Sequence, residues 1–141
     1  MKIAKKNKIK LIEDAAHGIG STYKKKKVGT VADFTCFSFQ AIKHMTTVDG
    51  GLLAMLSQDD YKRGKVLRWY GIDREAEVAG DSRIDVGIPE WGYKYHMNDV
   101  SAIIGITQMK YLKNIIKKHK ENAKHYLGNI NNSYYLHPVA P

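Results

Sequence analysis

The chain has 141 residues, a formal net charge of +9 and 43% hydrophobic residues. This length supports one compact core, and the apolar content is ordinary for a globular protein. The sequence shows no apolar run long enough to span a bilayer and no apolar leader segment, and it has a single cysteine. We therefore expect no membrane association and a reducing, cytoplasmic setting.

The positive charge is compatible with a nucleic acid, an anionic membrane or a phosphorylated substrate as partner. The lysines fall into separate groups near the start, at residues 24–27 and at residues 117–120. The middle group lies between two strand-like runs, which is typical of a solvated hairpin tip. One cysteine cannot build a zinc finger. Nucleic-acid binding is therefore the less favoured alternative.

Short apolar or β-branched runs predict strands at residues 8–13, 21–23, 27–31, 34–39 and 50–56. Residues 15–21 and 40–49 are predicted to be loops. Cys36 lies inside the fourth run, where a buried, reduced thiol is the ordinary expectation. Helical spacing follows at residues 59–68, with acidic residues near its start.

Residues 69–91 show no clear period and include Pro89, so they predict a long connection of the kind that covers a site or an interface. Asn98 is a good N-cap, and apolar residues then recur at three- and four-residue steps as far as Ile116. This pattern predicts one amphipathic helix whose apolar face packs in a core or an interface.

The most informative stretch surrounds Lys43, which lies in the loop after an aromatic strand. Ser38 precedes it, and a Gly50-Gly51 turn follows. A lysine that bonds covalently to a carbonyl cofactor needs a rigid strand end, a phosphate anchor and a carboxylate for the far side of the ring. Asp14 is the candidate carboxylate, although an isolated aspartate more often caps a strand or helix.

His17, three residues after Asp14, could stack on such a ring or bond to a ring oxygen. A lone histidine is otherwise more often structural than functional.

Several ordered motifs together resemble one protein family. They are IEDAAHGIGS at residues 12–21, VG at 28–29, DFTCFSF at 33–39, Lys43, DGG at 49–51, LRWYGI at 67–72 and GYKYHMND at 92–99. The sequence is similar to the DegT-type nucleotide-sugar aminotransferases, which are pyridoxal-phosphate enzymes of the aspartate aminotransferase fold.

The resemblance implies an α/β fold, a mixed and mostly parallel sheet with flanking helices. Residues 1–127 would form the central and C-terminal part of the large domain, and residues 128–141 would begin the connection to a small domain. Family subunits are much longer than this chain. We therefore expect a fragment, one piece of a split enzyme, or a truncated homologue without catalysis.

The resemblance also implies residue roles. Lys43 matches the lysine that forms the internal aldimine with pyridoxal 5'-phosphate (PLP) and later moves a proton. Asp14 matches the partner of the pyridine nitrogen, and His17 matches a position beside the ring and its phenolic oxygen. Ser38 matches a ligand of the cofactor phosphate, and Lys94 matches a residue that reaches the phosphate of the neighbouring subunit.

Three positions depart from the family pattern. Many relatives have asparagine where Lys94 stands and arginine where His96 stands, and His44 replaces a common asparagine. A lysine at position 94 still suits a phosphate as a point charge. The expected activity is amino transfer from glutamate to a keto sugar of a nucleotide-sugar, for surface polysaccharide or related sugar biosynthesis. A homodimer is expected.

Overall fold

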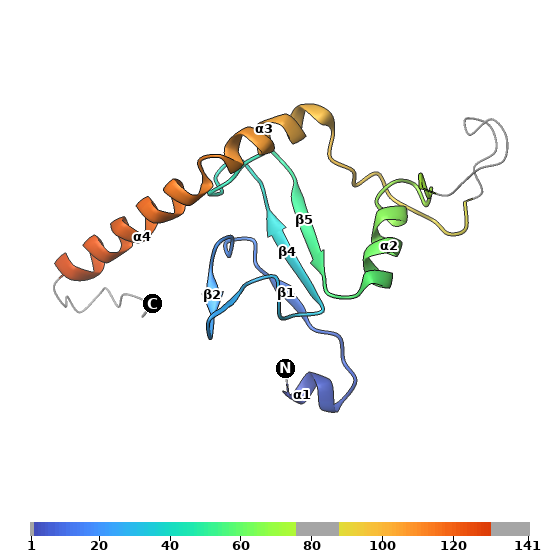
Figure 1. Cartoon of the computed structure of the whole chain (residues 1–141), viewed down its shortest axis with the longest axis horizontal. Coiled ribbons are helices and arrows are strands. Elements are labelled where there is room, and N and C mark those ends of the chain that lie inside the picture. The colour runs from blue at the N-terminus through green and yellow to red at the C-terminus, as the bar shows by residue number, and fades with distance from the viewer. Residues whose placement is uncertain (1, 76–87, 131–141) are drawn as a thin grey trace.

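The computed structural model describes residues 2–75 and 88–130. Its centre is a three-stranded sheet in the order β1-β4-β5, formed by β1 (Ile12–Asp14), β4 (Phe34–Ser38) and β5 (Gly51–Met55). β1 pairs with β4 in parallel, and β4 pairs with β5 antiparallel. The expected α/β architecture with a mixed sheet is confirmed (Figure 1).

The helices lie around this sheet. α1 spans Lys2–Lys6, α2 spans Gln58–Leu67, α3 spans Asp99–Met109 and α4 spans Leu112–Asn129. α2 lies beside β5, α3 crosses one end of the sheet, and α4 projects beyond it (Figure 1). In the described ranges, no helix is both long enough and apolar enough to cross a membrane.

The first strand is shorter than predicted. Residues 8–11 lie outside β1, and Lys8 adopts a φ of 55° in the turn that leaves α1. The chain then joins the sheet through Asp33, whose carboxylate accepts a hydrogen bond of 2.9 Å from the Leu11 N–H. This bond, together with the nearby Lys10 charge, holds the pKa of the half-buried Asp33 carboxyl below its ordinary value.

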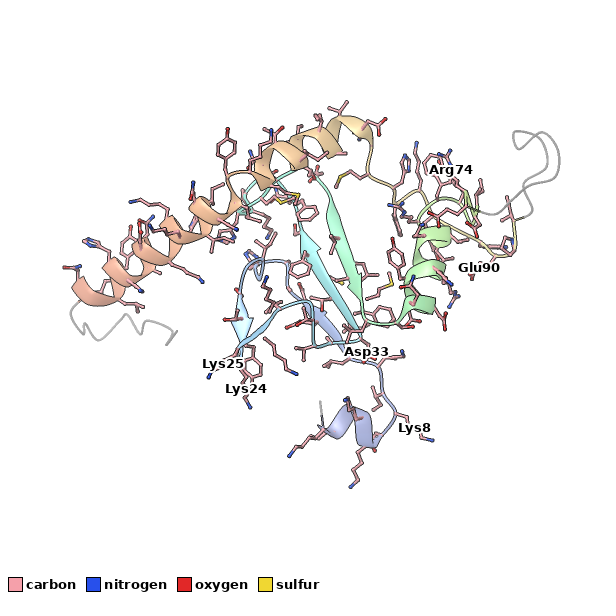
Figure 2. All side chains as sticks on the ribbon, in the orientation of Figure 1. Lys8, Lys24, Lys25, Asp33, Arg74 and Glu90 are labelled. Atoms are coloured by element: carbon pink, nitrogen blue, oxygen red, sulfur yellow. The ribbon has the colours of Figure 1, made fainter. Side chains whose placement is uncertain are left out.

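The lysine-rich hairpin tip is confirmed. β2 (Thr22–Tyr23) and β3 (Lys26–Lys27) pair antiparallel around a two-residue turn at Lys24 and Lys25, which lie at the tip in Figure 2. Both turn lysines have positive φ, 47° and 65°. β3 is shorter than the predicted strand at residues 27–31, because the N–H and hydroxyl of Thr30 both turn back to the Lys27 carbonyl.

The predicted helix at residues 59–68 is confirmed as α2, with the Ser57 hydroxyl accepting from the Asp60 N–H. The single amphipathic helix predicted from Asn98 to Ile116 is wrong in one respect, since it is interrupted between α3 and α4. The Tyr111 N–H bonds three residues back to Gln108. Such tighter turns are common where helices end, and the interruption begins a second helical segment.

Part of the predicted apolar helix face is open in the described structure. Val100, Ile103 and Met109 are exposed, whereas Ile104 is half-buried. The expected burial of Cys36 is also wrong, because this thiol is exposed. Cys36 pairs in register with Leu53, which is 47% exposed, so this face of the sheet is uncovered within the described residues.

The predicted connection at residues 69–91 falls partly outside the described residues. Its described ends pair with the segment that follows, since Trp69 forms an isolated bridge with Lys94. Arg63 of α2 also forms an ion pair of 2.9 Å with Glu90. These contacts tie the segment before α3 to the end of α2.

Candidate functional site

The carboxyl ends of two parallel strands place Asp14 and Ser38 at the same edge of the sheet. The register pairs Asp14 with Cys36, and Ser38 follows Cys36 by two residues. Side chains two residues apart on a strand share a face. Asp14 and Ser38 therefore lie on one face and at one end of the β1–β4 pair.

A cavity of about 500 Å³ lies directly after β1, and Asp14, His17 and Val28 contribute to its lining. A tight turn forms much of the lining. In this turn the Ala16 N–H donates to Asp14 Oδ1 at 3.0 Å, and the Gly18 N–H donates to the Ala15 carbonyl. Among the described residues, the hydrogen bonds of the exposed Asp14 carboxylate reach only Oδ1. Oδ2 is therefore available to a ligand.

Lys43 meets this cavity through His17. The lysine Nζ lies 3.0 Å from His17 Nε2, which is hydrogen-bonding distance. A protonated amine can donate only to a ring nitrogen that carries no proton, so the contact fixes the tautomer of His17 when Lys43 is charged. The structure thus brings together three predicted site residues: Asp14, His17 and Lys43.

The loop that carries Lys43 is held at its base by backbone hydrogen bonds. The Thr47 N–H donates to the Phe39 carbonyl, and the Phe39 N–H donates to the Gly50 carbonyl, both at 2.9 Å. Thr47 is 1% exposed, and its hydroxyl donates to the Asp49 carbonyl at 2.7 Å. The lysine is therefore mounted on a closed loop rather than on a free segment.

Ser38 and Lys94 have no contact with the group formed by Asp14, His17 and Lys43 among the described hydrogen bonds. The Ser38 hydroxyl oxygen accepts from the Gln40 N–H at 3.3 Å, at the strand end before the loop. Lys94 is exposed, pairs with Trp69 after α2, and does not contribute to the lining of the Asp14 cavity.

The residues at the cavity fit PLP by chemistry. A carboxylate with one available oxygen suits a protonated pyridine nitrogen, and a lysine amine suits the aldehyde carbon. The planar His17 ring and the apolar Val28 side chain offer surfaces for a flat ring. Ser38, at the same sheet edge as Asp14, offers a hydroxyl for a phosphate.

Two histidines, His44 next to Lys43 and His96 near the end of α2, have contacts that sequence reasoning missed. His44 packs against His119 of α4, with ring centroids 4.6 Å apart and planes at 75°. His96 packs edge-on against Trp69 at 3.9 Å, and its Nδ1 is buried with no hydrogen-bond partner among the described residues. Neither contact leaves a sequence signal, because the partners lie in different elements and single histidines have no characteristic spacing.

Comparisons with known proteins identify the family. The family model for the DegT/DnrJ/EryC1/StrS aminotransferase family matches residues 1–139. An uncharacterized protein of Methanocaldococcus jannaschii is 41% identical over 89% of this chain and 33% of its own length. The UDP-4-amino-4,6-dideoxy-N-acetyl-beta-L-altrosamine transaminase of Campylobacter jejuni is 35% identical over 97% of this chain and 35% of its own length.

Solved structures give the same result. Helicobacter pylori PseC, an aminotransferase involved in the biosynthesis of pseudoaminic acid, superposes with a TM-score of 0.79 at 29% identity, covering 89% of this chain and 32% of that one. The putative sugar aminotransferase Spr1654 of Streptococcus pneumoniae in its PMP form gives 0.81 at 31% identity, over 94% and 33%. The chain thus spans about a third of the length of these relatives. It belongs to the DegT/DnrJ/EryC1/StrS aminotransferase family.

Proposed function

We propose that this chain carries the cofactor-bonding part of a PLP-dependent nucleotide-sugar aminotransferase. The observation that supports the proposal most directly is the 3.0 Å contact between Lys43 Nζ and His17 Nε2 at the edge of the Asp14 cavity. The carboxylate comes from the end of β1, the imidazole from the loop after β1 and the amine from the loop after β4. They meet where a flat, anionic cofactor has room. Family membership supplies the reaction class.

Each side chain has a separate task in this proposal. Lys43 would be the catalytic residue: its amine would hold the cofactor covalently and would carry a proton afterwards. The Asp14 carboxylate would hold a proton on the pyridine nitrogen, and PLP when bound would supply an electron-withdrawing ring. His17 orients the Lys43 amine through its hydrogen bond and would offer its ring to the cofactor.

The cofactor phosphate is assigned to Ser38 and Lys94. Ser38 is near enough in the fold to act within one subunit, because it shares a sheet edge with Asp14. Lys94 lies outside that cavity, and we propose that it reaches the phosphate of a neighbouring subunit. This assignment makes the active assembly a homodimer.

The substrate class follows from named relatives. They include the C. jejuni transaminase that acts on a UDP-linked amino sugar, and a spore coat polysaccharide biosynthesis protein of Bacillus subtilis. We propose that the whole enzyme transfers an amino group from glutamate to a keto carbon of a nucleotide-sugar in polysaccharide or related sugar biosynthesis. We place this reaction in the cytoplasm.

Reductive trapping tests the cofactor assignment. The purified chain is incubated with PLP and reduced with borohydride, and peptide mass spectrometry locates the pyridoxyl group. We expect the group on Lys43, with loss of the adduct in Lys43→Arg and retention in Lys24→Arg, a matched change at the exposed hairpin tip. If the adduct is spread over surface lysines and absent from Lys43, the assignment is wrong.

A second candidate is that the chain binds the cofactor without turning over, as a truncated homologue or as one half of a split enzyme. Its basis is that the chain spans only about a third of the relatives. Release of 2-oxoglutarate from glutamate by the PLP-loaded chain separates the two. Trapping on Lys43 without release supports the second candidate, whereas release supports catalysis by this chain.

A further inference from the structure

The residue immediately after Lys43 contacts a helix that is distant in sequence. His44 is half-buried in the lysine loop, and its ring meets the exposed His119 on α4, with centroids 4.6 Å apart in an edge-to-face arrangement. A second contact holds the same helix nearby, because the Ile116 side chain lies directly over Gly20 in the loop after β1. α4 therefore rests on both loops that form the site.

The groups that face His44 are all basic. His119 faces it from α4, His17 from the loop after β1, and Lys43 from its own loop. Burial is the main cause that lowers the pKa of His44, and these three groups lower it further. Within residues 2–75 and 88–130, none of the groups that shift the His44 pKa is a carboxylate that could stabilise an imidazolium ion. An added proton on His44 would thus be half-buried beside basic groups rather than acidic ones.

We propose that the contact between His44 and His119 positions Lys43, and that it works as a proton-sensitive latch: α4 is held against the lysine loop while the half-buried His44 imidazole is neutral and is released when that ring gains a proton. The positioning part rests on the proposed function, because it assigns a purpose to the placement of Lys43. The latch itself depends only on contacts within the chain.

The direction of the pH effect follows from the sign of the shift. A histidine whose pKa is lower in the closed state than its ordinary value of 6.5 takes up a proton on opening. The latch is therefore at full strength above pH 6.5 and is lost as the pH falls through the lower, closed-state pKa. One linked proton changes the closing equilibrium by at most about tenfold per pH unit.

Hydrogen exchange on the full chain tests the latch. We expect amides of the lysine loop and of α4 around His119 to lose protection, beyond the intrinsic pH effect, as the pH falls below 6.5. His119→Phe keeps an aromatic edge but removes one of the basic groups that face His44, so it should weaken this pH dependence. His125→Phe is the matched control, since the aromatic and hydrogen-bond partners of the His125 ring among the described residues, Tyr126 and Asn129, belong to its own helix.

Wild-type protein gives an independent measurement if His119→Phe does not fold. The C2–H resonance of His44 should titrate below 6.5. Titration at or above that value, or a pH-dependent protection that His119→Phe leaves unchanged, would overturn the latch.

Reductive trapping across the same pH range completes the test. We expect the yield on Lys43 to fall at low pH more steeply in the wild type than in His119→Phe. Equal pH profiles would overturn the positioning role. Absence of the adduct at every pH, with the exchange result intact, would instead reject the proposed function and leave the latch standing.

Discussion

Replacing Gly105 with alanine should destabilise the protein, although alanine is the better helix former. Gly105 is the buried residue of α3. A Cβ added there would lie 2.9 Å from Thr47 Cγ2 and 3.8 Å from Met45 Cε. Thr47 is 1% exposed and is fixed by its hydroxyl bond to the Asp49 carbonyl, so its methyl group cannot move away freely.

Two opposing effects set the magnitude. Alanine gains about 1 kcal/mol over glycine inside a helix. Extra volume in a tightly packed position costs typically about 1–3 kcal/mol. The net change for Gly105→Ala should therefore lie between about zero and 2 kcal/mol of destabilisation, because the nearest neighbour is held rather than flexible.

Two other helical glycines provide matched controls. A Cβ on Gly64 of α2 would meet the flexible end of Met55, with Cε at 2.6 Å, and a Cβ on Gly128 of α4 would meet nothing within 4 Å. Both alanine variants should be neutral or more stable by up to about 1 kcal/mol. Urea unfolding followed by circular dichroism gives the comparison. If Gly105→Ala is stabilised as much as Gly128→Ala, α3 does not rest on the lysine loop as described.

Three further predictions concern the hydroxyl, ion-pair and turn contacts. Thr47→Val should cost about 1–2 kcal/mol in urea unfolding, because it removes a buried hydroxyl donor at nearly constant shape. The ion pair with Arg63 lowers the pKa of Glu90, so the pair stabilises the fold above pH 4.5, the ordinary pKa of a glutamate. This stabilisation is lost as the pH falls through the lower pKa of Glu90 in the folded protein. Glu90→Gln should therefore flatten the plot of unfolding midpoint against pH in this acidic range. Replacing Lys24-Lys25 with Asn-Gly should raise the thermal midpoint, because both turn positions have positive φ.

The parts of the site that are close in sequence were predictable. Asp14 and His17 share one turn, and Lys43 and Ser38 share one strand end, so each pair follows from local pattern and strand direction. The parallel pairing of β1 with β4 then brings the two pairs to one edge of the sheet. The roles of these residues rested on the family resemblance, which also implied the mostly parallel sheet to which this pairing belongs.

Contacts between distant elements could not be predicted in the same way. The periodicity that predicted an amphipathic helix through Ile116 is correct on each side of the break, but it carries no information about the tighter turn at Tyr111. Burial was overestimated for the same physical reason. A strand pattern shows that Cys36 suits a sheet interior, but whether another layer covers its face depends on tertiary contacts.

In the described residues, α3 and α4 both contact the loop that carries Lys43. Among the named elements, these helices pack on each other and not on a strand. Both helices contact loops instead: Gly105 lies over Thr47, Ile116 over Gly20, and His119 against His44. Two of these three contacts are made with the loop that carries Lys43. A change that shifts α3 or α4 should therefore alter the reactivity of Lys43 before it unfolds the sheet, whereas Gly64→Ala in α2 should leave that reactivity unchanged.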